Sequence, residues 1–258
     1  MSTFLWQNII FGPIHSRRLG SSLGINLLPV SGKVCNFDCI YCECGWNRDG
    51  RTTEALPTFE EISTEMKTKF DRLVSEGTRI DTITFSGNGE PTLHPDFPSI
   101  IDLTLELRDR FFPQALISVL SNATTAHKKE IRDALLKIDN PIMKLDGGSD
   151  RLVRLLNRPQ VSYSKEKILS ALKAFNGNFI LQTMFLRGEN DGSVIDSTEF
   201  GNVESWMECV RELHPRQVMI YTIDRDTPAK SLKKIPVIEM ETIAGRLRNE
   251  GFSVQVCG

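Results

Sequence analysis

The sequence has no excess of positive charge and no long apolar run. Lys and Arg number 31 against 33 Asp and Glu, a formal net charge of -2, so no overall basic field draws the protein toward nucleic acid. No segment approaches the roughly 20 apolar residues that a membrane-spanning helix needs, and the N-terminal run before Pro13 lacks the features of a signal peptide. We therefore expect a cytoplasmic protein with no membrane partner, in a compartment where thiols stay reduced.

Low-complexity linkers and internal repeats are also missing from the 258 residues. A chain of this length can build one sizeable core. We therefore expect a single domain over 1–258, with an N-terminal extension at 1–20, a core at 21–225, and a C-terminal helix with a possible edge strand at 226–258.

Apolar runs of strand length alternate with amphipathic helical stretches along the chain, which is typical of repeated βα units around a parallel sheet. The predicted strands are 23–28, 80–85, 116–120, 142–145, 179–185 and 217–222. The predicted helices are 58–76, 96–110, 125–137, 149–156 with 164–175, 200–213 and 236–250. Six units are fewer than a full eight-stranded barrel has, so the α/β pattern predicts a partial (β/α)6 TIM-like barrel, and 252–256 can add an edge strand.

Cysteine is concentrated in one short loop, CNFDCIYCECGW, directly after the first predicted strand. Cys35, Cys39 and Cys42 form a CxxxCxxC pattern whose thiolates can converge on one metal centre. A 4Fe-4S cluster normally takes four cysteine ligands, so three leave one iron open for an exchangeable ligand. Structural zinc with Cys44 as fourth ligand is the alternative, although zinc sites usually show two separated pairs.

This loop resembles the motif of the radical S-adenosylmethionine (radical SAM) superfamily, with Tyr41 at its aromatic position. The flanking segments FGPIHSRRLGSSLGINLLP and TFSGNGEPTLHPDF resemble a subgroup related to wyosine synthases, over roughly residues 10–225. The resemblance implies a barrel of the radical SAM type and an enzyme. In that family the open iron chelates S-adenosylmethionine, and one electron cleaves it to a 5'-deoxyadenosyl radical that abstracts hydrogen from a substrate.

The resemblance also implies residues that bind the cofactor. SGNGEPT is similar to a GGEP motif that receives the ammonium of S-adenosylmethionine, with Asn88 inserted between the glycines. Ser121 and Asn122 end the third predicted strand, where an N-cap is the alternative role. Gln182 is a lone polar residue in an apolar strand, which a hydrogen bond to cofactor or substrate explains, with a bond to neighbouring backbone as the alternative. The expected cofactor-binding residues are Tyr41, Gly87, Asn88, Gly89, Glu90, Ser121, Asn122 and Gln182.

Charged residues also occur at other barrel-mouth positions. Lys144 and Asp146 share one face of the fourth predicted strand, so we expect them to be catalytic, with a mutual salt bridge as the alternative. Arg17 and Arg18 can bind an anion, since guanidinium groups match carboxylate and phosphate. Three further residues follow or end the last core strand and are substrate-binding candidates: Tyr221, Asp224 and Arg225.

The substrate is not encoded in any recognisable motif. A wyosine-type tRNA-modifying enzyme and an activase of a glycyl-radical enzyme are the alternatives, whereas a non-enzymatic metal-binding protein would need a saturated metal. tRNA is not the favoured partner, because no cysteine precedes Cys35 to hold a second cluster and no basic domain is present. An electron donor such as flavodoxin or ferredoxin is implied, and Cys44, Cys209 and Cys257 are not expected to bind the cluster.

Overall fold

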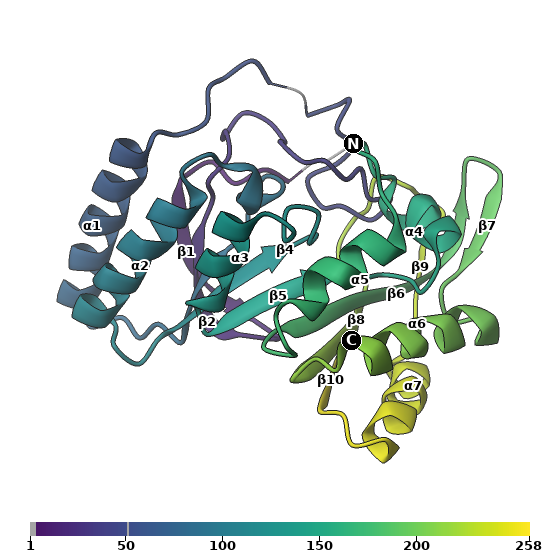
Figure 1. The fold of residues 1–258 in the computed structure, drawn as a ribbon. Coiled ribbons are helices and arrows are strands. Elements are labelled where there is room, and N and C mark those ends of the chain that lie inside the picture. The colour runs from purple at the N-terminus through teal and green to yellow at the C-terminus, as the bar shows by residue number, and fades with distance from the viewer. Residues whose placement is uncertain (1–3, 51) are drawn as a thin grey trace.

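The computed structural model describes residues 4–50 and 52–258. Within them, one curved sheet carries the fold (Figure 1), and its strands run in the order β1-β2-β3-β4-β5-β6-β8-β10. All neighbours after β2 are parallel. These strands are β2 (Gly20–Ile25), β3 (Thr82–Phe85), β4 (Leu116–Ser121), β5 (Asn140–Lys144), β6 (Ile180–Asn190), β8 (Gln217–Thr222) and β10 (Val254–Cys257).

Helices connect the parallel strands. They are α1 (Phe59–Ser75), α2 (Phe97–Phe111), α3 (Lys129–Leu136), α4 (Asp150–Asn157), α5 (Lys165–Lys173), α6 (Phe200–Leu213) and α7 (Val237–Asn249). The predicted capping box is present at α1, where Thr58 accepts from the Glu61 amide and Glu61 accepts from the Thr58 amide. The curved parallel sheet with its connecting helices confirms the predicted partial (β/α)6 barrel. The helix ends agree with the sequence pattern to within a few residues.

Three strands were not predicted. β1 (Ile10–Ser16) lies inside the expected N-terminal extension and pairs antiparallel with β2, while β7 (Ser193–Asp196) and β9 (Lys233–Lys234) pair with the extended end of β6. The predicted strand at 23–28 is wrong at its end. It stops at Ile25 because the Asn26 side chain turns the chain, donating to the Leu28 carbonyl and accepting from the Leu28 amide.

The two faces of the sheet are packed differently. Alternate strand residues such as Ile83, Val119 and Leu181 pack in the main core, which the helices share. The opposite, inner face holds a second apolar cluster of Ile142, Ile180 and Met219, against which Leu19 packs. Leu19 comes from the turn between β1 and β2, so this turn reaches into the concave side of the sheet.

Contacts of the same turn close the open side of the half-barrel. Arg17 donates to the carbonyl of Gly258 and pairs with Asp224 at 3.2 Å. Gly258 follows β10 and Asp224 follows β8, so the first hairpin is fastened to the far edge of the sheet. Among the described residues, no helix is both long enough and apolar enough to cross a bilayer.

Candidate active site

The cysteine loop is held from two sides by backbone hydrogen bonds. On one side the Val34 amide donates to the Asn88 carbonyl, and the Glu90 amide donates to the Val34 carbonyl. On the other side, the amides of Asp38 and Ile40 donate to carbonyls at the C-terminus of α4. These carbonyls have no partner within the helix, so the loop satisfies them and is positioned in return.

Lys33 places a buried positive charge beside the three cysteines. Its side chain is 1% exposed, and its Nζ donates to the Gly45 carbonyl at 2.7 Å. Burial by itself lowers the pKa of Lys33, but the thiols of Cys42, Cys35 and Cys39 outweigh it and raise the pKa. The Asp38 carboxylate is 3.7 Å away, longer than a close ion pair. The ammonium is therefore fixed by the Gly45 carbonyl inside the cysteine loop, where both the thiols and Asp38 favour its charged form.

Two amide side chains donate toward sulfur atoms of the cysteine loop. Asn157 Nδ2, at the end of α4, donates to Cys39 Sγ at 3.4 Å, and Asn122 Nδ2 lies 3.9 Å from Cys35 Sγ. Donors to sulfur stabilise thiolate and tune the potential of iron–sulfur clusters. Sequence reasoning missed Asn157 because nothing in LLNRP signals that it meets a loop more than a hundred residues earlier.

The thiols differ in acidity. A hydrogen bond from Cys44 lowers the pKa of Cys42 to about 6, against the opposing effect of burial and with the help of Lys33. Burial raises the pKa of Cys39 to about 11 and also raises the pKa of Cys35. Cys44 Sγ also lies 3.4 Å from the Gly87 carbonyl. Cluster binding must therefore displace protons from at least two of the three thiols.

These residues fit a cluster better than a single ion. No three Cys, His, Asp or Glu side chains of residues 4–50 and 52–258 converge tightly enough to hold one metal ion. In a 4Fe-4S cluster each thiolate binds a different iron, so such convergence is not required. A buried ammonium and two amide donors around three thiols suit an anionic thiolate-bound cluster.

The SGNGEPT loop packs against the cysteine loop rather than leaving space beside its glycines. A Cβ on Gly87 would lie 2.4 Å from Asn26 Oδ1, and a Cβ on Gly89 would lie 1.9 Å from the Val34 carbonyl oxygen. Both glycines have φ angles in the region that favours glycine, 153° and 141°. Their first role is therefore close contact between the two loops.

Asn88 holds the N-terminal segment. Its Oδ1 accepts from the Trp6 amide at 2.9 Å, and its Nδ2 donates to the carbonyls of Trp6 and Pro29. The residue is fully buried. The side chain of this predicted cofactor ligand is thus bonded to protein, because its amide meets the backbone of Trp6 and Pro29.

Glu90 joins three segments at the mouth. Its carboxylate accepts from the Asn122 amide at 2.7 Å and from the amide and hydroxyl of Thr92, and Ser121 also contacts it. Burial raises the pKa of Glu90 despite these donors. The structure therefore brings together three predicted residues, Glu90, Ser121 and Asn122, directly beside Cys35.

A second polar group links β5 to the cysteine loop. Asp146 accepts from the Tyr41 hydroxyl, from Asn157 Nδ2 at 2.6 Å and from the Met184 amide at 2.8 Å. Lys144 Nζ lies 3.6 Å from Asp146. The predicted pair is thus an ion pair at the mouth, in which Asp146 is completely buried and Lys144 keeps 18% of its side chain exposed.

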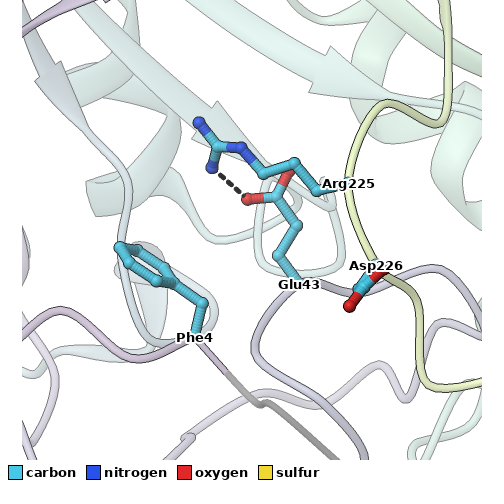
Figure 2. A pocket seen from close by; sticks show the side chains of 4 residues that line it. All are labelled: Phe4, Glu43, Arg225 and Asp226. Atoms are coloured by element: carbon cyan, nitrogen blue, oxygen red, sulfur yellow. Dashed lines mark hydrogen bonds and ion pairs between the residues drawn. The ribbon is translucent and has the colours of Figure 1, made fainter.

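The substrate-binding candidates at the end of the last core strand lie in different places. Tyr221 joins the inner face, where its hydroxyl accepts from Lys144 Nζ at 3.0 Å. Arg225 instead pairs with Glu43 at 2.5 Å, in a hollow of about 310 Å³ lined by Phe4, Glu43, Arg225 and Asp226 (Figure 2). Glu43 lies between Cys42 and Cys44, so this hollow adjoins the cysteine loop from outside.

The other two cysteines lie away from the loop. Cys209 is buried in α6, where its thiol donates to the Ser205 carbonyl at 3.3 Å. Cys257 lies in strand β10, where it is in register with Tyr221 of the neighbouring strand β8.

A family model described as the radical SAM superfamily matches residues 30–201. These residues include the cysteine loop, the SGNGEPT loop and strands β3 to β6. The chain belongs to the radical SAM superfamily. It is therefore an enzyme, and members of this superfamily generally use S-adenosylmethionine and a 4Fe-4S cluster.

Relatives of this radical SAM enzyme extend the comparison. A UPF0026 protein of Methanocaldococcus jannaschii is 32% identical over 252 residues, which cover 95% of this chain and 72% of that protein. A Brachyspira hyodysenteriae protein named GTPase Obg is 30% identical over 90% of this chain, but the chain spans only 32% of it. A radical SAM methyltransferase from Sphaerobacter thermophilus shares the fold, with a TM-score of 0.68, 17% identity, and coverage of 92% of this chain and 65% of that one.

Proposed function

We propose that Cys35, Cys39 and Cys42 hold one 4Fe-4S cluster whose fourth iron binds S-adenosylmethionine, and that the enzyme abstracts hydrogen from a substrate still to be identified. The observation that carries the proposal is the three-cysteine loop itself, which encloses the buried Lys33 ammonium and has Asn157 Nδ2 at 3.4 Å from Cys39 Sγ. When bound and reduced, by a donor such as flavodoxin or ferredoxin, the cluster supplies the electron that cleaves S-adenosylmethionine to a 5'-deoxyadenosyl radical.

The residues of the chain position and insulate this chemistry. Asn157 and Asn122 donate toward Cys39 and Cys35, while Glu90 fixes the Asn122 backbone beside the expected cofactor ammonium. Buried side chains around Cys39 exclude water, which strengthens each electrostatic contact there. Lys144 is the predicted catalytic group with an accessible side chain, and Asp146 acts on it through charge and position.

Anaerobic reconstitution tests the proposal. We expect about four irons per chain, and we expect dithionite with S-adenosylmethionine to yield methionine and 5'-deoxyadenosine. Changing any one of Cys35, Cys39 or Cys42 to Ala should abolish both cluster retention and cleavage, since no spare thiolate occupies the motif spacing. The matched control is the triple variant Cys44→Ser, Cys209→Ser, Cys257→Ser, which should keep its iron and its activity.

Two results would count against the proposal. Full activity in any single loop-cysteine variant would remove the ligand assignment. Close to eight irons per chain, falling to four in the triple variant, would indicate a second cluster. Adding bulk tRNA or a glycyl-radical enzyme to the same assay distinguishes the two alternative substrates.

A further inference from the structure

We propose that the inner face of the barrel binds an oxyanion of the substrate, a carboxylate or a phosphate, through Arg18, Lys144, Gln182 and Tyr221. This inference depends on the proposed function, because it assigns the substrate class of the same radical SAM site. It starts from Arg18, a cation for which the described part of the chain provides no counterion.

Arg18 lies in the turn between β1 and β2, and its guanidinium carbon is 4.7 Å from the centroid of the Tyr221 ring. Its Nη1 atom is buried and has no hydrogen-bond partner among residues 4–50 and 52–258. Within that same part of the chain it makes no ion pair either. A buried guanidinium nitrogen without an acceptor is costly, so this position suits a group that accepts hydrogen bonds from outside the chain.

The neighbouring arginine shows the difference. Arg17 is half-exposed, yet it has both a carboxylate partner, Asp224, and a carbonyl partner, Gly258. The hairpin is therefore fastened by Arg17, which leaves Arg18 free of that task. Arg17 and Arg18 are adjacent but differ in environment, and the more buried Arg18 has no side-chain hydrogen-bond partner in the part of the chain that the structure describes.

Further donors share the inner face with Arg18. Lys144, Gln182 and Met219 are in register on neighbouring strands, and Tyr221 is two residues beyond Met219. Lys144 Nζ is 5.5 Å from the Tyr221 ring centroid and donates to its hydroxyl oxygen, which leaves the hydroxyl hydrogen free to donate elsewhere. The Gln182 amide is 3% exposed, and its recorded contact is the Met219 sulfur at 3.8 Å, a weak acceptor.

Positive charge exceeds negative charge around Lys144 and Arg18 among the described residues. Asp146 is the carboxylate beside Lys144, and it already accepts from Tyr41, Asn157 and the Met184 amide. Burial by itself lowers the pKa of Lys144, but Asp146 and Tyr221 outweigh it and raise the pKa, so Lys144 is charged at neutral pH. Two cations thus lie near the Tyr221 ring, and Asp146 pairs with Lys144 alone among the described residues. Guanidinium, ammonium, amide and phenol donors together match an oxyanion.

The position of these donors is suitable for a substrate. Lys144 Nζ is also 5.2 Å from the centroid of Tyr41, which lies between two of the cluster cysteines in sequence. An oxyanion held by Arg18 and Lys144 would therefore tether a substrate on the same side of the barrel as the radical source.

Calorimetric titration of the reconstituted enzyme with S-adenosylmethionine present tests this inference, using succinate and inorganic phosphate as separate probes. We expect saturable binding of at least one probe, and the tighter probe indicates a carboxylate or a phosphate substrate. Arg18→Met should weaken binding at least about tenfold, and Gln182→Leu should weaken it less, since it removes a neutral donor. The control Arg17→Met should change it by no more than about twofold, because Arg17 is already paired.

Several outcomes would overturn the inference. They are the absence of binding to wild type, an equal loss in the Arg17 and Arg18 variants, or a lowered unfolding midpoint in Arg18→Met, which would mark Arg18 as a structural residue. S-adenosylmethionine carries its own carboxylate, so a parallel loss of cofactor affinity in Arg18→Met would assign the cation to the cofactor instead. If wild type fails to cleave S-adenosylmethionine, the proposed function fails. If wild type cleaves it but binds neither probe, only this inference fails.

Discussion

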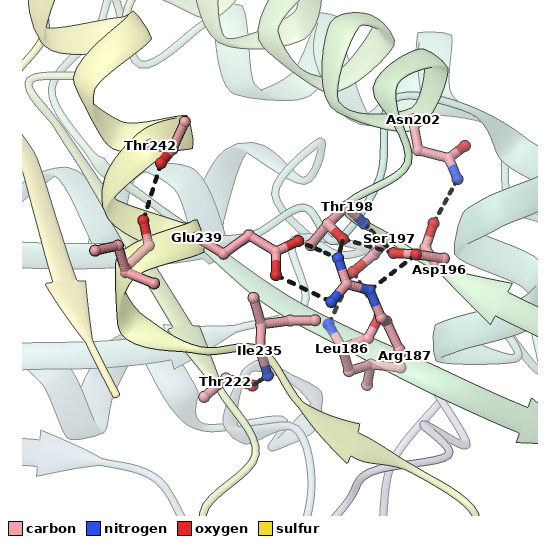
Figure 3. A network of polar contacts seen from close by, with 11 residues as sticks. Leu186, Arg187, Asp196, Ser197, Thr198, Asn202, Thr222, Ile235, Glu239 and Thr242 are labelled. Atoms are coloured by element: carbon pink, nitrogen blue, oxygen red, sulfur yellow. Dashed lines mark hydrogen bonds and ion pairs between the residues drawn. The ribbon is translucent and has the colours of Figure 1, made fainter.

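Arg187, in strand β6, and Arg18, in the turn before β2, are both partly buried arginines, but within residues 4–50 and 52–258 only Arg187 has carboxylate partners. Arg187 donates to Asp196 on β7 at 2.8 Å, to both carboxylate oxygens of Glu239 on α7, and to Thr198 (Figure 3). It thereby ties β6, β7 and α7 together. Arg18 makes no such contact within the described residues and stacks on Tyr221.

The difference distinguishes charges that stabilise the fold from charges that we propose bind a ligand. A structural cation carries its counterions in the chain, because an unpaired buried charge destabilises the protein. Lys33 is intermediate, since its ammonium donates to the Gly45 carbonyl and lies 3.7 Å from Asp38, while the thiols of the cysteine loop also raise its pKa. Both Lys33 and Arg18 lie near the mouth of the barrel, where we propose that a cofactor and a substrate bring negative charge.

Glu90 sharpens the comparison because it lies at the mouth and yet is satisfied by protein donors. We expect Glu90→Gln to weaken S-adenosylmethionine binding about ten- to a hundredfold, which corresponds to roughly 1.5–3 kcal/mol for a charge-assisted hydrogen bond. The glutamine keeps the shape but loses the charge expected to meet the cofactor ammonium. Calorimetry on reconstituted protein with full iron content measures the effect.

Glu61→Gln, in the capping box of α1, is the control for Glu90 and should leave cofactor affinity unchanged. Unchanged affinity in Glu90→Gln would show that the carboxylate serves only the Asn122 and Thr92 backbone. Glu90 would then belong with Arg187 among the structural charges.

Lys33→Met tests the cluster side of the comparison. Removing a buried positive charge beside the thiols should make the cluster harder to reduce, since reduction adds negative charge. At an effective dielectric constant near 20 the expected shift is on the order of 100 mV to more negative potential. A redox titration followed by electron paramagnetic resonance measures the potential of whatever cluster is loaded, and Lys33→Arg, which keeps the charge, is the control. An unchanged potential would show that solvent screens the ammonium.

Local patterns were sufficient to predict most of the fold. Strands β3 to β6 and β8, with the intervening helices, follow from apolar periodicity, because that period is set by residues close in sequence. β1 was missed since its run, IIFGPIHS, contains Gly12 and Pro13, which usually interrupt strands. The pairing of β1 with β2 compensates for that weak local preference.

The candidate site could be predicted only in part. The cysteine spacing and the Glu90 segment are local motifs, and they led to residues that the structure places together. The partners Asn157 and Lys33 were not found, because their roles depend on contacts between the cysteine loop, α4 and buried sulfur. Asn88 was assigned to the cofactor from its place in a motif, although its side chain holds Trp6.

Arg187→Met is the stability counterpart and should give the smallest effect. We expect the free energy of unfolding to fall by about 1–2 kcal/mol, because the variant leaves two partly exposed carboxylates without their shared partner. Urea unfolding measures the fall, and cofactor affinity should not change.

The stabilisation by Arg187 should depend on pH. The hydrogen bond from Arg187 lowers the pKa of Glu239, so this stabilisation is present above the unfolded pKa of about 4.3 and is lost as the pH falls toward the folded value. The difference between wild type and variant should therefore shrink at acidic pH. Arg211→Met, which breaks a pair with one carboxylate, Glu250, should cost less stability. An equal loss in both variants would mean that the Arg187 network adds no stability beyond an ordinary surface ion pair. Arg187 would then no longer be an example of a structural cation to compare with Arg18.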